Sequence, residues 1–347
     1  MPQSSRIRVV RWLAVIFLGA SAALAAERAS FDDELRRGLV ALENNNLTEA
    51  KQSLEEASRL QPKSPKVWIA LAQAYWRSKQ AGPAQAAAKR AEVLAANDPV
   101  IQHALAIFYS ETGSYAKAAD LARNDEGFAF DLGQKILQRG DFAGAFSFFQ
   151  AARGRFPNSA QIELAYGVAA YGQRRFADSI DSFLRVIRID PSVEQPYVFL
   201  ARLLDQAGGR LDQITAAYAA WERAAPGNCL PLCLHAKALS AGGGDPAEIE
   251  AELRQSIRLN GAYWESHFEL GLLLAKSRRW EEAAAELARS IQLNPKHAAA
   301  HFQLARVYEK LGKPELARAE RAEHERLTAA ESNVERALPG APNQPHP

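Results

Sequence analysis

Apolar and small residues recur along the chain at spacings of three and four, with charged residues between them. Residues 47–62 (LTEAKQSLEEASRLQP) and residues 279–295 (RWEEAAAELARSIQLNP) show the same pattern, although they lie near opposite ends of the chain. This spacing places apolar side chains on one face of an α-helix, and the proline that closes each segment ends the helix. The pattern therefore predicts an amphipathic helix that recurs along the chain.

The closing prolines give the period of this recurrence. Pro62, Pro157, Pro191 and Pro295 occupy equivalent places, and Pro157 and Pro191 are 34 residues apart. Self-similarity at such a period is typical of proteins built from stacked structural repeats. Twelve positions before each proline lies a small residue: Ala50, Ala145, Ser179 or Ala283. Eight positions before each proline lies a large apolar residue: Leu54, Phe149, Phe183 or Leu287.

The repeated pattern resembles the tetratricopeptide repeat, a 34-residue unit of two antiparallel helices. The unit at Pro65 has Trp68 early in its first helix, then Leu71 and Tyr75, and then Ala84 in its second helix. Glycines such as Gly113, Gly140 and Gly312 lie between the two helices, where a left-handed residue ends the first one. Units counted in this way begin near Phe31, Pro65, Pro99, Glu126, Ala160, Glu194, Leu230, Trp264 and Ala298.

The resemblance implies an all-α fold, a right-handed superhelical solenoid of about nine antiparallel helix pairs. Shortening of the repeat in LARNDEGFAFDLG predicts a break between a first block, residues 26–125, and a second block, residues 126–329. An insertion is predicted in QAGGRLDQ, and the first helix of the unit near Leu230 has a weak pattern. The proline-rich segment 330–347 is predicted to be a disordered tail.

The first 25 residues differ from the rest of the chain. Arg6, Arg8 and Arg11 precede the apolar run WLAVIFLGASAALA, which ends in the small-residue sequence 23–25 (ALA). This pattern predicts a secretory signal peptide, residues 1–25, cleaved after Ala25, because the run is shorter than the ~20 residues of a membrane span. The mature protein is expected to be periplasmic or secreted, without stable membrane insertion. An uncleaved anchor is the alternative.

Charge and motifs exclude several classes of function. The 42 Lys and Arg residues nearly balance the 40 Asp and Glu residues, so a nucleic-acid partner is not expected. No phosphate-binding loop, nucleophile elbow or zinc-protease motif is present. We therefore expect no enzymatic activity and no cofactor.

Histidine and cysteine residues give two further candidates. His297 and His301 have the spacing of two ligands on one helix face, but His301 and His267 occupy the place of Trp68 in their units, which favours packing over a metal site. Cys229 and Cys233 are one helical turn apart and form either a local disulfide or two free thiols. Their spacing, followed by His235, does not fit the haem motif C-x-x-C-H.

The resemblance also implies a binding surface. In this family the first helices line a concave groove, and their second, fifth, ninth and twelfth positions contact a bound peptide. The composition of these positions here, rich in aromatic and aliphatic residues, suits an extended or helical peptide. The groove residues predicted in this way are Ile69, Gln73, Trp76, His103, Ile107, Phe130, Gln134, Leu164, Tyr171, Arg202, Phe268, Leu272, Phe302 and Arg306.

The sequence thus predicts a scaffold that binds protein or peptide partners in the assembly of a cell-envelope complex. Its strongest contacts are expected at Trp76, Tyr171, Phe268 and Phe302. The alternatives are a structural spacer that associates with itself, since a homo-oligomer is compatible with the pattern, and an accessory subunit of an envelope enzyme.

Overall fold

The computed structural model describes residues 28–95 and 98–337, with side chains up to residue 330. Within these ranges all regular secondary structure is helical. The predicted signal peptide, residues 1–25, and residues 338–347 of the predicted tail lie outside the described residues. Helix α18 (Pro314–Ala337) continues into the segment that was expected to be disordered from residue 330.

The chain divides into two compact units, which we call the amino unit (Met1–Gln173) and the carboxy unit (Arg174–Pro347). The division lies between residues 173 and 174, whereas the sequence placed a break between residues 125 and 126. At that earlier point α6 (Tyr115–Leu121) is shortened to seven residues, as the compressed repeat predicts. It still packs closely on α8 (Phe142–Arg155), so the stacking of helices continues through the predicted break.

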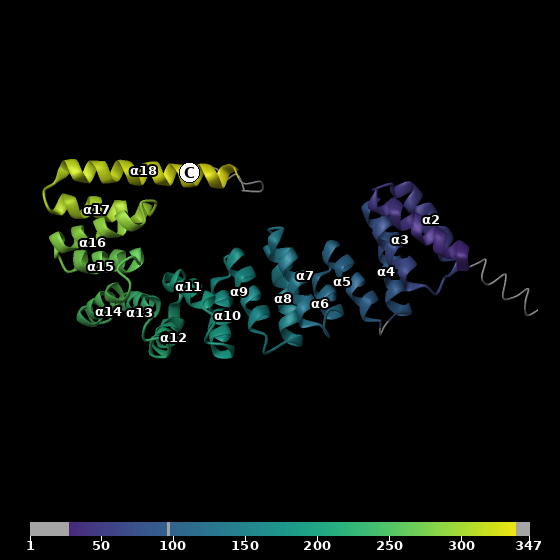
Figure 1. Ribbon diagram of the computed structural model, residues 1–347, viewed down its shortest axis with the longest axis horizontal. Helices are drawn as coiled ribbons and strands as arrows, with labels where there is room; N and C mark the ends of the chain where they lie inside the picture. Colours follow the sequence, from purple (N-terminus) through teal and green to yellow (C-terminus); the bar gives the residue numbers. More distant parts are fainter. Residues whose placement is uncertain (1–27, 96–97, 338–347) are drawn as a thin grey trace, which may run out of the picture. The chain divides into compact units, whose positions relative to one another are not determined.

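The amino unit is a stack of helix pairs that follow one another along the chain (Figure 1). A helix at residues 28–43 packs on α2, where Gly38 faces Leu54, and α3 then pairs with α4. Besides α6 and α8, the helices of this unit are α2 (Leu47–Leu60), α3 (Pro65–Arg77), α4 (Ala81–Leu94), α5 (Pro99–Glu111), α7 (Glu126–Gln138) and α9 (Ala160–Gly172).

The carboxy unit continues the same arrangement, and Figure 1 shows α15 to α18 lying in successive layers. Two short 3-10 turns, Leu204–Gln206 and Gly208–Arg210, follow the shortened helix α11 where an insertion was predicted. Besides α18, the helices of the carboxy unit are α10 (Phe176–Ile189), α11 (Gln195–Ala201), α12 (Leu211–Ala224), α13 (Cys229–Ala241), α14 (Pro246–Leu259), α15 (Trp264–Lys276), α16 (Trp280–Leu293) and α17 (Ala298–Lys310).

The helices of a pair approach closely because a small residue on the first faces a large one on the second. A Cβ atom added at Gly133 would lie 2.3 Å from Cζ of Phe149, and one at Gly271 would lie 2.7 Å from Cγ of Leu287. Phe149 and Leu287 are the large residues found eight positions before the closing prolines. The sequence period therefore records the contact between the two helices of each pair.

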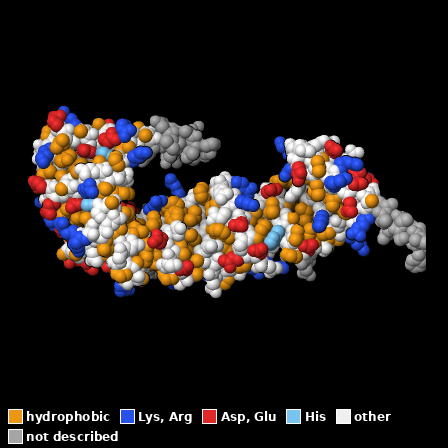
Figure 2. All heavy atoms as spheres, in the orientation of Figure 1, with side chains coloured by type: hydrophobic (Ala, Val, Ile, Leu, Met, Phe, Trp, Pro, Cys, Tyr) orange, Lys and Arg blue, Asp and Glu red, His pale blue; other side chains and the backbone are white. Residues whose placement is uncertain are grey.

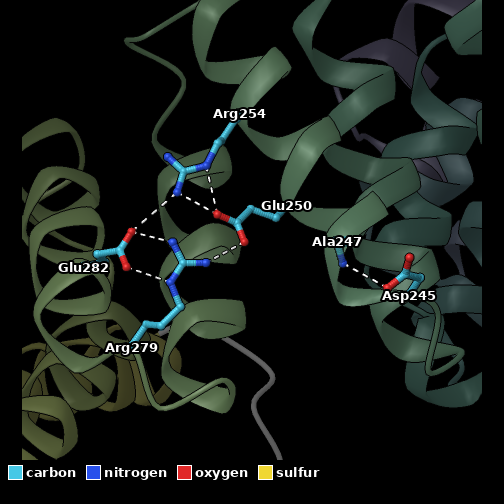
Figure 3. Close-up of polar contacts among 6 residues, drawn as sticks. All are labelled: Asp245, Ala247, Glu250, Arg254, Arg279 and Glu282. Atoms are coloured by element: carbon cyan, nitrogen blue, oxygen red, sulfur yellow. Dashed lines mark hydrogen bonds and ion pairs between the residues drawn. The ribbon is translucent and has the colours of Figure 1, made fainter.

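Ion pairs join second helices of neighbouring pairs in the carboxy unit. Figure 3 shows Arg279 between two carboxylates, with Nη1 2.7 Å from Oε2 of Glu250 and Nε 2.6 Å from Oε1 of Glu282. Arg254 on α14 lies 2.7 Å from Oε1 of Glu250 and also faces Glu282. Each charge thus has partners of opposite sign on both α14 and the start of α16.

Candidate functional site

The first helices of successive pairs form a continuous face within each unit. In the amino unit α3 contacts α5, α5 contacts α7, and α7 contacts α9. In the carboxy unit α11 contacts α13, α13 contacts α15, and α15 contacts α17. We call these two surfaces the first-helix faces. They are the surfaces on which the sequence placed the binding groove.

In the amino unit the structure places nearly all predicted residues at partly accessible positions on α3, α5, α7 and α9. Ile69 is the exception, because it is only 6% exposed and belongs to the hydrophobic core. Trp76, Ile107 and Phe130 lie at the edge of that core and pack against it with part of their surface. The half-buried members of the predicted set are Gln73, Trp76, His103, Ile107, Phe130, Gln134, Leu164 and Tyr171.

His103 pairs with an aromatic residue of the next first helix. Its ring stacks on Phe128 with 3.8 Å between the ring centroids, and Nε2 lies 3.7 Å from Oδ2 of Asp125. Asp125 is the N-cap of α7, where its other carboxylate oxygen accepts a hydrogen bond from the backbone N–H of Phe128. This region of the face therefore combines a flat aromatic surface with a carboxylate.

In the carboxy unit Phe268 and Leu272 are half-buried, while Phe302 and Arg306 are exposed. Phe302, at 39% exposure, borders a hollow of about 470 Å³ that is also lined by His297 and His324. The placement of Arg202 on the ninth position of a first helix is wrong. Because α11 ends at Ala201, Arg202 is the C-cap and lies outside the helix.

The carboxy unit's face also carries a charged cluster that was not predicted from the sequence. Nζ of Lys237, the ninth residue of α13, lies 3.1 Å from Oε1 of Glu265 and 3.2 Å from Oε1 of Glu269, both on α15. Burial opposes the charge of Lys237, but Glu269 and Glu265 outweigh it, so the pKa of Lys237 lies above its usual value. Burial also raises the pKa of Glu269. The weak sequence pattern in this region gave no groove prediction for Lys237. The structure nevertheless forms α13 as a complete helix of 13 residues.

The histidines that replace Trp68 have the packing role predicted for them. Nε1 of Trp68 donates to the carbonyl of Pro62 at 2.9 Å, six residues earlier. Nε2 of His267 and Nε2 of His301 lie 3.2 Å from the equivalent carbonyls of Gly261 and Pro295.

Each of these histidines also contacts a glutamate of its own pair. Nδ1 of His267 lies 2.7 Å from Glu286, and Nδ1 of His301 lies 2.6 Å from Glu320. His297 instead packs against the rings of Trp264 and Phe268. His297 and His301 thus have different partners.

A different histidine lies among carboxylates. Within residues 28–95 and 98–330, the one group of three metal-ligating side chains is Glu222, His235 and Glu252, whose ligand atoms all lie within 4.8 Å of one another. The hydrogen bond with Glu252, together with the charges of Glu222 and Glu248, holds the pKa of His235 above its usual value. The sequence predicted no metal site, because these residues come from three helices and form no local motif.

Cys229 and Cys233 are free thiols in the structure. Cys229 is the first residue of α13, so both cysteines lie on this helix. Burial raises the pKa of Cys233, which makes its thiolate unfavourable. Both residues therefore pack as small side chains at the start of α13.

The accessible surface carries charges of both signs. Figure 2 shows Lys and Arg side chains interspersed with Asp and Glu side chains on the face in view. None of the helices in the described part of the chain combines the length and the apolar character that crossing a membrane requires.

Stacked antiparallel helix pairs with contiguous first-helix faces define an α-helical repeat protein. Tetratricopeptide repeat models match residues 41–107 and 274–324 in one case and residues 128–194 and 242–292 in another, together more than half of the chain. The chain belongs to the tetratricopeptide repeat family. Such arrays present extended surfaces for binding other proteins.

Several solved structures are similar to this chain at low sequence identity. MamA from Desulfovibrio magneticus RS-1 is 15% identical with a TM-score of 0.42, over 50% of this chain and 97% of its own. Yeast Tom70 is 14% identical with a TM-score of 0.43, over 88% of this chain and 89% of its own. A chain in the structure of the APC/C hetero-tetramer Cut9–Hcn1 is 15% identical with a TM-score of 0.47, over 88% of this chain and 63% of its own. No curated protein matches the chain significantly.

Proposed function

We propose that this protein is a non-catalytic scaffold that binds peptide or protein segments along its first-helix faces during assembly of a cell-envelope complex. The observation that carries the proposal is the presence of partly accessible aromatic residues on these faces. Trp76 and Tyr171 lie on the amino unit's face, and Phe268 and Phe302 on that of the carboxy unit. Aromatic side chains contribute most of the binding free energy in many protein interfaces.

The polar groups beside these aromatics favour a peptide as the ligand. Arg306 lies with its guanidinium carbon 5.8 Å from the centroid of the Phe302 ring, and the His103 and Asp125 pair flanks Phe128. Backbone amides and carbonyls of a bound segment would find donors and acceptors at these places. The contacts are spread over several helices, which suits an extended or helical segment better than a small molecule.

The envelope part of the proposal is supported by the sequence of residues 1–25, with its three arginines, apolar run and small-residue cleavage motif. Mass spectrometry of the amino terminus of the protein recovered from cells tests export directly. A first residue at Ala26 supports it, and an intact Met1 or Pro2 in a cytoplasmic fraction contradicts it.

Affinity capture tests the role of the aromatic residues. The bait is the protein, compared with a variant carrying Trp76→Ala, Tyr171→Ala, Phe268→Ala and Phe302→Ala. We expect the variant to retain at least about tenfold less of the partner, because each anchor contributes roughly 1–2 kcal/mol or more.

The matched control changes exposed apolar residues on second helices, Val93→Ala and Leu259→Ala, which lie outside the first-helix faces. This control should capture as much partner as the parent. Equal capture by all three proteins, with helical content unchanged, would overturn the proposal and favour a self-associating spacer, which sedimentation at several protein concentrations would reveal.

A further inference from the structure

Three consecutive helices of the carboxy unit direct metal-ligating side chains to one point. Glu222 lies near the end of α12, His235 in the middle of α13, and Glu252 in the middle of α14. Nδ1 of His235 lies 3.0 Å from Oε1 of Glu252 and 3.4 Å from Oε2 of Glu222. We propose that these three side chains bind a divalent transition-metal ion, with zinc as the best match.

The distances fit this proposal. Zinc binds histidine nitrogen and carboxylate oxygen at about 2.0–2.2 Å, and two ligands of a tetrahedral ion at that distance are roughly 3.3 Å apart. The two separations from Nδ1 bracket this value. All three ligand atoms lie within 4.8 Å of one another, so rotations of the side chains would suffice to surround one ion.

One carboxylate oxygen of Glu252 also supports the presence of a cation. Its Oε2 atom is buried and has no hydrogen-bond partner. A buried carboxylate oxygen without a partner is unfavourable, and a cation held by this carboxylate would supply the interaction that Oε2 lacks while Oε1 faces His235. The carboxylate of Glu248, one helical turn before Glu252, also acts on His235 and adds to the negative charge around the site.

The two following units contain histidine–glutamate pairs that differ from this site. Glu286 and Glu320 occupy the seventh position of α16 and α18, as Glu252 does in α14, and each contacts a histidine. Those histidines lie at the fourth position of their helices, and their second nitrogen faces a backbone carbonyl. Neither pair belongs to a group of three ligands in the described part of the chain.

The donor set decides the class of ion. One imidazole and two carboxylates suit zinc and other first-row divalent ions better than calcium or magnesium, which prefer oxygen ligands alone. Three protein ligands leave one position of a tetrahedral ion for water or a further carboxylate. The bound ion would tie α12 to α13 and α14, directly after the two 3-10 turns that interrupt the regular stacking.

Calorimetric titration of the tag-free, EDTA-treated protein with Zn²⁺ tests the proposal, with Co²⁺ absorption as a readout of coordination geometry. We expect one equivalent of Zn²⁺ to bind and the Co²⁺ complex to show the intense visible bands of a four-coordinate ion. His235→Asn and Glu252→Gln should each weaken binding at least about tenfold. Glu222→Gln should weaken it similarly, and this side chain, the most exposed of the three, is the one whose change is least expected to disturb the fold.

His267→Asn is the matched control, because His267 has the same type of glutamate partner but no second carboxylate in a ligand group. This variant should bind Zn²⁺ as the parent does. Failure of the parent to bind Zn²⁺, or unchanged affinity in both His235→Asn and Glu222→Gln, would overturn the proposal. The site does not depend on the proposed peptide binding, and neither result changes the expectation for the first-helix faces.

Discussion

The turn between the two helices of a unit passes through a single residue with positive φ. Gly113, Gly140 and Gly312 fill this place in three units, as the sequence predicted. Lys79 and Arg278 fill it in two others, with φ values of 61° and 59°. A side chain in this left-handed region is unfavourable by roughly 1–2 kcal/mol, so these two residues store strain that glycine would not.

Lys79→Gly and Arg278→Gly are therefore expected to raise the free energy of unfolding. The gain should be about 0.5–1 kcal/mol each, because the greater freedom of glycine in the unfolded chain offsets part of the relief. Urea unfolding followed by circular dichroism measures the change. Lys79→Ala is the control, since it removes the same side chain but keeps the strain; a gain as large in Lys79→Ala would show that the turn conformation is not the cause.

Residue-level burial is where the sequence was least informative. Ile69 and Gln73 both occupy positions that the repeat pattern assigns to the groove, yet Ile69 belongs to the core and Gln73 is partly accessible. The pattern fixes the direction of a side chain relative to its own helix. Burial also depends on how closely the next helix packs, which no single repeat encodes.

At the scale of elements, the repeat pattern predicted where most of the first helices begin. The first residues of α3, α5, α7, α9, α15 and α17 are the predicted starts of their units. The weak pattern near Leu230 nevertheless formed a complete helix, because tertiary packing on both sides compensates for weak local preference. The group of Glu222, His235 and Glu252 was not predictable, since only the stacking of three helices brings these residues together.

The ion pairs between α14 and α16 make stability depend on pH. Hydrogen bonds from Arg254 and Arg279 lower the pKa of Glu250 below its usual value of 4.5. A carboxyl whose pKa is lower in the folded state adds stability above 4.5, and that contribution disappears as the pH falls below 4.5 through the folded-state pKa.

Glu250→Gln should therefore be less stable than the parent at pH 7, with the difference shrinking as the solution is acidified below the usual glutamate range. The measurement is urea unfolding of both proteins at several pH values. Glu281→Gln, on the exposed surface of α16, serves as the control and should leave the pH profile unchanged. A constant difference between parent and Glu250→Gln at every pH would argue against a role for the charge.

At the scale of the whole molecule, charge and surface composition restrict how partners are bound. The formal net charge is only +2, and charges of both signs are interspersed on the visible surface (Figure 2). Aromatic and aliphatic residues on the first-helix faces, not a single-signed field, would supply the affinity for a partner.

Partner capture should consequently change little between about 0.05 and 0.5 M salt, a range over which the Debye length falls from roughly 14 to 4 Å. Retained partner, quantified after washing at each salt concentration, tests this expectation. A loss of most of the partner over this range would show that ion pairs, such as one with the exposed Arg306, dominate the interface.

The matching contacts of His267 and His301 have a consequence for the evolution of the chain. In both units Nε2 of the histidine lies 3.2 Å from a backbone carbonyl oxygen of the preceding turn. A duplicate of residues 264–297 inserted after residue 297 would place a new histidine against the carbonyl of Pro295. The same contact can therefore form between any two copies of this unit. Duplication of the unit would lengthen the protein without requiring a new type of contact between units.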